Sequence, residues 1–404
     1  MDLRCSGKDL VPNHLTFFIY NHCAVWSKHP EYWPRGIRAN GHLMLNDAKM
    51  SKSTGNFLTA VEAIERYSAD GVRFALADAG DGNDDANFKT ETAEQAVTRL
   101  AGLIASEKEL LGSCVEQEAH DTTKELIFQA QFYDCAARCN RAYGRCMFRE
   151  GTIILMNEMA RARDLYLRTC EQEGVRPSAT LVRAFVQLHT QLLAVICPHV
   201  AEEVNAEVLG NKESVFERKL DQAELDRKAF EFARYINTYD QICQMIARLK
   251  MRYNDVCKPR KDGTVPPKPV RGTVYVATDF LEWQAKLIEF LGAKFEAAGG
   301  KLGKDIMGQA RAFAMDELKV DPKETKKVIK FATDFVNLSK TEGKDAFVVR
   351  MPFDEKQVYG EYAFLIKQNL GLESVDVFQV GEGPVAAAKC AAAQPGRPII
   401  FFDL

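Results

Sequence analysis

The sequence predicts a multidomain, mainly α-helical protein that begins with part of an α/β fold and ends with a small α/β domain. Three observations support this fold class. At 404 residues, the chain is longer than one ordinary core can organise, so two or three domains are expected. Residues 91–252 show helical periodicity with few breaks. Strand-like runs occur only before residue 60 and after residue 272.

Composition and charge are those of an ordinary globular chain. Hydrophobic residues make up 46% and charged residues 27%. The net charge of −3 excludes a chain that is basic throughout, but it permits local basic faces. No apolar run approaches the roughly 20 residues that span a bilayer, and the first residues lack the apolar stretch of a signal peptide. The eleven cysteines lack Cys-x-x-Cys pairs, so they imply neither zinc nor disulfides, and a reducing cytosol is the expected compartment.

The first domain, residues 1–80, is expected to be an incomplete α/β fold. The pattern predicts a strand, an apolar buried helix, an extended segment and two short helices, over residues 3–7, 15–25, 37–45, 60–67 and 68–79. A nucleotide-binding sheet needs several parallel strands with a crevice between them. Because this segment has too few strands to close such a sheet, we expect it to be one half of that fold.

A short basic loop lies between the extended segment and the first of these two helices. Its residues are Lys49, Met50, Ser51, Lys52, Ser53, Thr54, Gly55 and Asn56. Thr59 and Glu62 fit a capping box, which predicts a helix start at about Ala60. Lysines beside a helix N-terminus can hold phosphate. Two lysines in a loop usually remain solvated. The order of the five residues 49–53 is, however, a much more specific signal of a functional loop than their composition alone.

The second domain, residues 81–255, is expected to be a helical bundle that follows an acidic turn. Its predicted helices are 90–112, 122–148, 152–172, 179–196, 199–209 and 221–252. Arg141, Arg145 and Arg149 recur every four residues, so they should stack on one face of the second long helix. Such a stripe is most often a solvated face. The alternative is a rail for RNA phosphates, which suit guanidinium groups.

A basic, proline-containing linker at residues 256–271 is expected to lead into an α/β domain at residues 272–404. The linker could lie along RNA or remain solvated. The predicted elements of the last domain are a strand at 273–278, a helix from Asp279 to Gly299, a helix from Asp321, a strand at 346–351, a helix at 355–370 and a strand at 374–380. The apolar run 399–402 has no predicted strand partner, which suggests a shortened C-terminus. No catalytic constellation occurs here, so a binding or positioning module is expected.

Several stretches resemble known synthetases. Residues 49–53 read Lys-Met-Ser-Lys-Ser. This string resembles the second signature motif of class I aminoacyl-tRNA synthetases, which lines the ATP phosphates. Residues 2–15, 38–43 and 68–80 resemble the leucyl-tRNA synthetases of eukaryotic-cytosolic and archaeal type. Thr54 stands where the isoleucyl, valyl and methionyl enzymes usually carry other residues.

The resemblance continues beyond the first domain. Residues 197–203 look like the Pro-His-x-x-Glu-Glu stretch of the family's anticodon-binding bundle. The likeness is densest over residues 1–88 and looser from Thr273 onward. It implies that residues 1–80 are the C-terminal part of a Rossmann-like catalytic domain and that residues 81–255 bind tRNA.

The activity that the resemblance implies is activation of leucine by ATP, with Mg²⁺ accompanying the nucleotide, and transfer of leucine to leucine tRNA. Lys52 is then expected to bind ATP phosphate, and Lys49 is expected to assist. Met50, Ser51 and Ser53 complete the loop. Gly7 and Asp9 match the family's Gly-x-Asp/Glu turn near the adenosine. The arginines Arg141, Arg145 and Arg149 would contact tRNA.

Two features of the family are missing from the sequence. It contains no string like His-Ile-Gly-His, the family's first ATP motif, and no editing insert. The chain therefore resembles the C-terminal portion of a longer, cytoplasmic synthetase, and alone it is expected not to activate leucine. The alternatives are a non-catalytic tRNA-binding or scaffold protein derived from a synthetase, and a synthetase for another aliphatic amino acid. The sequence does not indicate membership of a multi-synthetase assembly.

Overall fold

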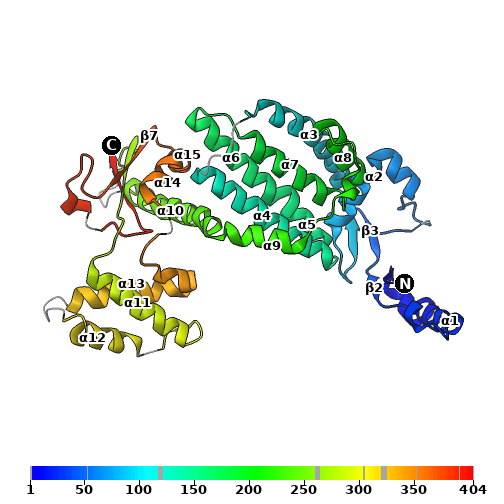
Figure 1. The fold of residues 1–404 in the computed structure, drawn as a ribbon, viewed down its shortest axis with the longest axis horizontal. Helices are drawn as coiled ribbons and strands as arrows, with labels where there is room; N and C mark the ends of the chain where they lie inside the picture. Colours follow the sequence, from blue (N-terminus) through cyan, green and yellow to red (C-terminus); the bar gives the residue numbers. More distant parts are fainter. Residues whose placement is uncertain are drawn as a thin grey trace. The chain divides into compact units, whose positions relative to one another are not determined.

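The computed structural model describes residues 2–51, 53–116, 122–259, 264–303, 305–319, 325–351, 353–390 and 392–403. It comprises two compact units, Met1–Ile236 and Asn237–Leu404. Helices make up most of both units, and strands form small sheets (Figure 1). The predicted fold class, mainly helical with small α/β parts, is confirmed. Among the described residues, no helix is both long enough and apolar enough to cross a membrane.

Long helices form the body of the first unit. They are α1 (Thr16–Val25), α2 (Ala60–Ala79), α3 (Thr90–Ser113), α4 (Thr123–Gly144), α5 (Phe148–Ile153), α6 (Ala160–Glu173), α7 (Ala179–Leu193), α8 (Pro198–Glu203) and α9 (Gln222–Glu231). Short π-helical turns at Ile154–Met159 and Val204–Val208 connect α5 to α6 and extend α8. The helices that periodicity predicts therefore form, although α4 ends earlier than expected and the helix predicted at 221–252 is interrupted at Phe232.

The core of the first unit contains a group of aromatic rings from α4, α6 and α7. Phe128 stacks on Tyr166 with ring centroids 4.6 Å apart and ring planes at 3°. Phe132 and Phe185 meet at a near-right angle beside them. All four residues are at most 2% exposed. Since aromatic side chains bury large apolar areas, this group contributes strongly to the stability of the bundle.

Short strands precede and follow the basic loop in the sequence. β1 (Arg4–Gly7) pairs in parallel with β2 (Ile37–Asn40). In a second sheet, β3 (Leu43–Leu45) lies between β4 (Ala48–Lys49), which is antiparallel, and β5 (Ala86–Phe88), which is parallel. Asn46 and Asp47 join β3 to β4 in a two-residue turn with φ angles of 50° and 65°. Asn and Asp tolerate this conformation, and such turns match the twist of a hairpin.

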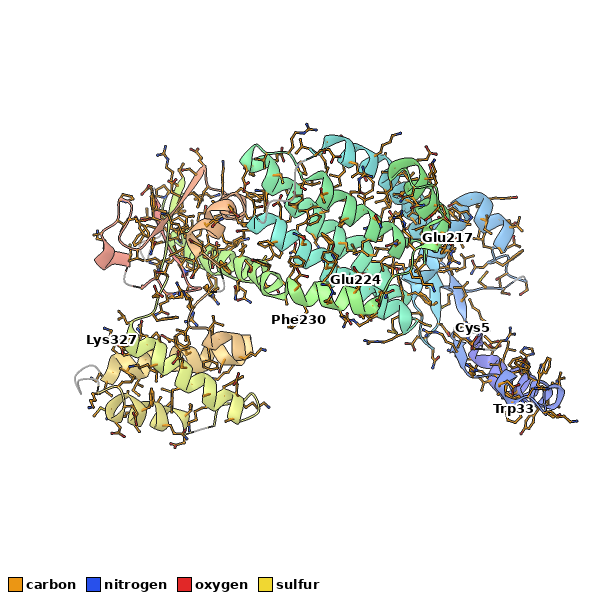
Figure 2. All side chains as sticks on the ribbon, viewed as in Figure 1. Cys5, Trp33, Glu217, Glu224, Phe230 and Lys327 are labelled. Atoms are coloured by element: carbon orange, nitrogen blue, oxygen red, sulfur yellow. The ribbon has the colours of Figure 1, made fainter. Side chains whose placement is uncertain are left out.

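The apolar segment near the N-terminus is helical, as predicted, but α1 is not buried. Phe17 is 66% exposed, Tyr20 72% and Val25 74%. Trp33, labelled in Figure 2, also lies at the surface, where its indole N–H donates to the Trp26 carbonyl (2.9 Å). A helix that is apolar on all sides is buried only when another layer covers it. In the described part of the chain, no layer covers this face of α1.

α2 consists of two helical parts that meet at Ser68, as the sequence predicts. Ser68 has φ 60° and ψ 164°, which interrupts the helix. Its Oγ accepts a hydrogen bond from the Gly71 N–H (3.2 Å) and so caps the second part. At the start of α2, Thr59 and Glu62 form the predicted capping box.

The second unit contains a sheet and two groups of helices. β6 (Arg271–Val276) pairs in parallel with β7 (Ser374–Gln379) and antiparallel with β8 (Ile399–Asp403). The helices are α11 (Glu282–Ala297), α12 (Ile306–Asp316), α13 (Thr325–Glu342), α14 (Glu355–Glu361) and α15 (Ala363–Leu370). α10 (Ala233–Cys257) contains the boundary between the units. α11, α12 and α13 share an apolar core that includes the predicted stripe of Val328, Phe331, Ala332 and Phe335.

Two strand predictions for this unit are wrong. Residues 346–351 do not form a strand: a 3-10 turn at Gly343–Phe347 precedes an irregular segment. Phe347 and Val349 pack against the core of the helical group instead, so their apolar character reflects that contact. The run 399–402, predicted to lack a partner, forms β8 against β6. Local pattern alone could not identify this non-local pairing.

Three helix predictions also need correction or qualification. The first helix of the unit is capped at Leu281, whose N–H bonds to the Gln284 side chain (3.1 Å), and not at Asp279. The helix predicted at 355–370 is broken at Tyr362 into α14 and α15. The start predicted at Asp321 lies outside the described residues, as do residues 260–263 of the predicted linker.

Candidate functional site

The basic loop begins at Lys49 of β4. Together with the residues that lead into α2 at Ala60, it spans residues 49–59, and this range is called the loop from here on. The Ser51 N–H donates to the Asn56 carbonyl (2.9 Å), which closes the loop at its base. The Asn56 side-chain nitrogen lies 3.2–3.4 Å from the carbonyl oxygens of Leu45, Ala48 and Lys49. One amide side chain therefore ties the loop to the preceding hairpin. Gly55 adopts φ 73°, a conformation that glycine reaches without strain.

The side chains of the loop divide into an anchor and a polar surface. Met50 packs against a small cluster that includes Leu45, Tyr67 and Phe88. Lys49 is exposed. The hydroxyl oxygens of Ser51 and Ser53 are 2.8 Å apart, and the Thr54 hydroxyl donates to the Ser51 carbonyl (3.2 Å). Lys52 lies outside the described residues.

The N-terminus of α2 is already satisfied by the protein itself. The Glu62 carboxylate accepts hydrogen bonds from the Thr59 N–H (3.0 Å) and the Thr59 hydroxyl (2.8 Å). These bonds lower the pKa of Glu62. Because a carboxylate occupies this helix end, Lys49 and the loop's hydroxyls, more than the helix terminus, are the described groups that remain for an anion.

Gly7 and Asp9 lie in a separate turn that follows β1. A Cβ on Gly7 would come within 2.6 Å of Asp9 Oδ1, so the carboxylate lies directly against the glycine. Asp9 is exposed. Among the described residues, no hydrogen bond joins Gly7 or Asp9 to the loop. The structure thus brings Lys49, Met50, Ser51 and Ser53 together and places Gly7 and Asp9 in a second, adjoining element of the same unit.

An ion pair fixes the turn after β1. Lys8 Nζ lies 2.7 Å from Asp85 Oδ1, which also accepts the His42 backbone N–H at 2.9 Å. The Lys8 ammonium and then the His42 amide lower the pKa of Asp85 to about 2. Gly41 is required here, because a Cβ would lie 2.1 Å from the Asp84 carbonyl oxygen. The acidic turn at residues 81–85 therefore stabilises the sheet edge next to Gly7.

The prediction that Arg141, Arg145 and Arg149 stack on one face of a single helix is wrong. α4 ends at Gly144, Arg145 caps it, and Arg149 belongs to α5. Four-residue spacing stacks side chains only while one helix continues. The chain turns at Cys146, which has φ 56°, and Gly151 of α5 then lies against the Tyr143 ring, where a Cβ would come within 2.3 Å. Contact of the three exposed arginines with RNA stays a prediction.

All three arginines make contacts within the protein, and the Arg145 carbonyl accepts a hydrogen bond from Arg38 Nη1 (3.4 Å). Arg141 Nη2 lies 3.4 Å from Asp226 Oδ1. The Arg149 N–H donates to the Asp81 carboxylate (2.9 Å). Their guanidinium groups nevertheless remain at the surface.

Three polar residues that the sequence did not single out connect the loop-bearing segment to the bundle. Arg38 Nη2 donates to the carbonyls of Asp81 (2.6 Å) and Cys146 (2.8 Å). Asp70 accepts from the Val200 N–H (2.7 Å) and faces His199 Nδ1 (2.9 Å). Arg73 Nε donates to the Ile196 carbonyl (2.7 Å). Their one sequence signal is that Arg38, Asp70 and Arg73 fall within the synthetase-like stretches.

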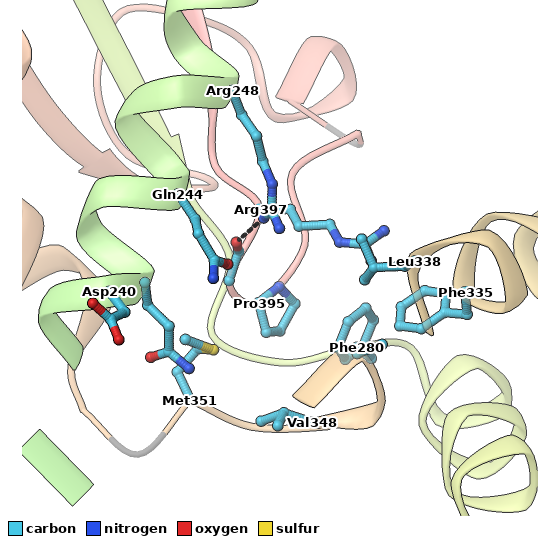
Figure 3. Close-up of a pocket in the computed structure, with 13 residues that line it drawn as sticks. Asp240, Gln244, Arg248, Phe280, Phe335, Leu338, Val348, Met351, Pro395 and Arg397 are labelled. Atoms are coloured by element: carbon cyan, nitrogen blue, oxygen red, sulfur yellow. Dashed lines mark hydrogen bonds between the residues drawn. The ribbon is translucent and has the colours of Figure 1, made fainter. Parts of the chain in front are cut away.

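The second unit has a polar pocket of about 260 Å³, shown in Figure 3. α10 contributes Gln244 and Arg248, whose Nη1 donates to the Gly396 carbonyl (2.9 Å). The Arg397 guanidinium lies over the Phe335 ring, 4.5 Å from its centroid. The sequence did not predict this pocket, because its lining comes from segments up to 150 residues apart. No catalytic arrangement is evident among its described residues.

Two family models match successive parts of the chain. The family model described as tRNA synthetases class I (M) matches residues 3–105. The model described as the anticodon-binding domain of tRNA ligase matches residues 127–256. The loop therefore lies in a synthetase-like region, and α4 to α10 lie in a region similar to anticodon-binding domains.

Individual relatives are similar over the whole chain. The cytoplasmic leucine–tRNA ligase of Pongo abelii is 33% identical, and the match covers 100% of this chain and 34% of the relative. The enzyme of the same name from Arabidopsis thaliana is 35% identical, with 100% and 38% covered. A solved complex of Agrobacterium radiobacter K84 agnB2 LeuRS with tRNA and LeuAMS has a TM-score of 0.44 at 19% identity and covers 53% of this chain and 28% of that chain.

The chain spans about a third of the length of the curated relatives it matches. Its identity to them nevertheless extends from one end of the chain to the other, and it includes both a synthetase domain and an anticodon-binding domain. Along its whole length, this chain is therefore similar to part of the leucine–tRNA ligases.

Proposed function

We propose that this chain is part of a leucine–tRNA ligase and supplies its ATP-phosphate loop together with its tRNA-binding domains. One observation carries the proposal: in the region that matches class I synthetases, Lys49 is exposed at the start of the loop, and the Ser51 N–H bonds to the Asn56 carbonyl. Met50 and Asn56 fix the backbone of that loop from below. A loop that is fixed in this way can present a lysine ammonium group to a nucleotide without a change in the surrounding fold.

The chemistry of leucine activation suits these residues. The leucine carboxylate attacks the α-phosphate of ATP and pyrophosphate leaves, so negative charge shifts onto phosphate oxygens. Positioned cations stabilise such a transition state strongly. Lys52 is proposed to bind the phosphates and Lys49 to assist, while Ser51 and Ser53 set the loop conformation. Mg²⁺ would accompany ATP.

The remaining assignments follow the same proposal. Gly7 and Asp9 would lie near the adenosine. Residues 1–80 would form the catalytic part, 81–255 the anticodon-binding bundle, 256–271 a linker and 272–404 a positioning domain. Leucine tRNA would be the partner, with Arg141, Arg145 and Arg149 as phosphate contacts. The cytoplasm is the proposed location, in agreement with the names of the relatives.

A pyrophosphate-exchange assay tests whether the chain acts alone. Purified chain, ATP and leucine are expected to give no leucine-dependent exchange, because the chain spans about a third of its relatives. Clear exchange would show that residues 1–404 suffice for activation, and the partial role proposed here would be wrong.

Substitution of Lys52 tests the role of the loop. In a complete ligase that carries these residues, Lys52→Ala is expected to lower leucine-dependent exchange by about 10²–10³-fold, by analogy with the loss of one transition-state donor. Affinity for leucine tRNA should stay unchanged. Lys108→Ala, at an exposed position on α3, is the matched control. If exchange survives in Lys52→Ala, the catalytic role proposed for Lys52 is wrong.

A further inference from the structure

Two charged residues on one turn of α2 hold the corner between α7 and α8. Arg73 donates from Nε to the Ile196 carbonyl (2.7 Å) and from Nη2 to the Val195 carbonyl (3.0 Å). Asp70 accepts from the Val200 N–H (2.7 Å) and pairs with His199 Nδ1 (2.9 Å). Arg73 thus holds the end of α7, and Asp70, three residues earlier on α2, holds the start of α8.

The charges are placed as the two helix ends require. The carbonyl oxygens after α7 carry partial negative charge, and the guanidinium of Arg73 meets them. The N–H groups at the start of α8 carry partial positive charge, and the carboxylate of Asp70 meets them. Asp70 is only 2% exposed. A buried carboxylate is costly unless it is hydrogen-bonded, so these contacts determine where α2 can sit on the bundle.

The same helix also supports the basic loop. Phe74 and Ala77 of α2 belong to the core of the bundle. Tyr67 and Ala75 belong to the small cluster against which Met50 and Leu58 pack. α2 therefore has one face in the bundle core and another face under the loop, and Asp70 and Arg73 fix it between them.

We infer that Asp70 and Arg73 are positioning residues, which set the basic loop relative to the tRNA-binding bundle and make the loop respond when the bundle binds tRNA. The inference rests on the proposed function. Neither residue would touch ATP or leucine. The kink at Ser68 separates the part of α2 that they fix from the part that leads to the loop.

Hydrogen exchange of the loop, measured with and without a transcribed leucine tRNA, tests this inference on the chain as it is. In the wild type, tRNA is expected to slow exchange of residues 49–59 by about tenfold, a common size for coupling between sites. Asp70→Asn removes the negative charge and one of the two acceptor oxygens that face His199 and the Val200 N–H, and Arg73→Lys can reach only one carbonyl. Both variants should lose most of this response while their tRNA affinity stays within about twofold.

Glu65→Gln is the matched control, because Glu65 is an exposed acid on the first part of α2. It should keep the full response. A purely structural role would lower the melting temperature of the variants but leave the tRNA response intact below it, and that result would overturn the inference. If Asp70→Asn fails to fold, Arg73→Lys, at an exposed position, decides the question.

The wild type separates this inference from the function on which it rests. Binding of leucine tRNA with no change in loop exchange would overturn the inference alone. No binding of leucine tRNA would overturn the proposed tRNA partner and the inference with it.

Discussion

Residues 2–67 and residues 68–231 of the first unit bury their apolar side chains very differently. In the later region, Phe128 and Phe185 lie in a closed core at 1% exposure. In the earlier region, Phe17, Tyr20 and Val61 show most of their surface. The border falls at the Ser68 kink of α2. The difference teaches that the bundle closes a large core, whereas the loop-bearing region leaves much of its apolar surface exposed and buries only a small cluster that includes Leu45, Tyr67 and Phe88.

Matched aromatic substitutions sharpen this comparison most. Phe128→Ala should destabilise the first unit by about 3–5 kcal/mol, because it opens a cavity beside Tyr166 and Phe185. Phe17→Ala should change stability by no more than about 0.5 kcal/mol. Urea unfolding followed by helical circular dichroism measures both. Similar losses for the two variants would mean that α1 is covered after all.

Removal of the Asp70 carboxylate tests the border itself. Asp70→Ala leaves the buried Val200 N–H without its acceptor, so a loss of about 1–3 kcal/mol is expected. Glu65→Ala, on the exposed side of the border, should cost no more than about 0.5 kcal/mol. Urea unfolding at neutral pH compares them. Equal stabilities would remove the energetic distinction between the two parts of α2.

The kink itself is tested by two substitutions at Ser68. Ser68→Ala loses the cap of the Gly71 N–H and keeps the unfavourable backbone angle, so a loss of about 1 kcal/mol is expected. Ser68→Gly also loses the hydroxyl, but glycine adopts φ 60° without strain, and stability should change by only a few tenths of a kcal/mol. Thermal unfolding ranks the pair. A ranking in the opposite order would argue that the φ angle imposes no strain.

Local rules predicted much of the fold. The periodicity of residues 90–231, the Thr59–Glu62 capping box and the Ser68 helix start depend on neighbours in sequence, and all of them form. The loop string also indicated the synthetases to which the chain is similar, because its residue order is far more specific than its composition.

Features that depend on distant partners were missed. The arginine stripe failed because α4 ends at Gly144 and the chain turns at Cys146, after which Gly151 packs back on Tyr143. The pairing of β8 with β6 joins segments more than a hundred residues apart. Likewise, Asp70 meets His199 across 129 residues, and no local pattern marks either as the other's partner.

Native-state hydrogen exchange of the two parts of α2, in the chain without ligands, tests the central claim most directly. The account predicts that amides of residues 72–79, fixed to the bundle through Asp70 and Arg73, exchange at least about tenfold more slowly than those of residues 63–67, because fewer contacts hold the earlier part. Equal rates, or slower exchange in residues 63–67, would contradict the claim that the bundle holds the second part of α2 more firmly than the first.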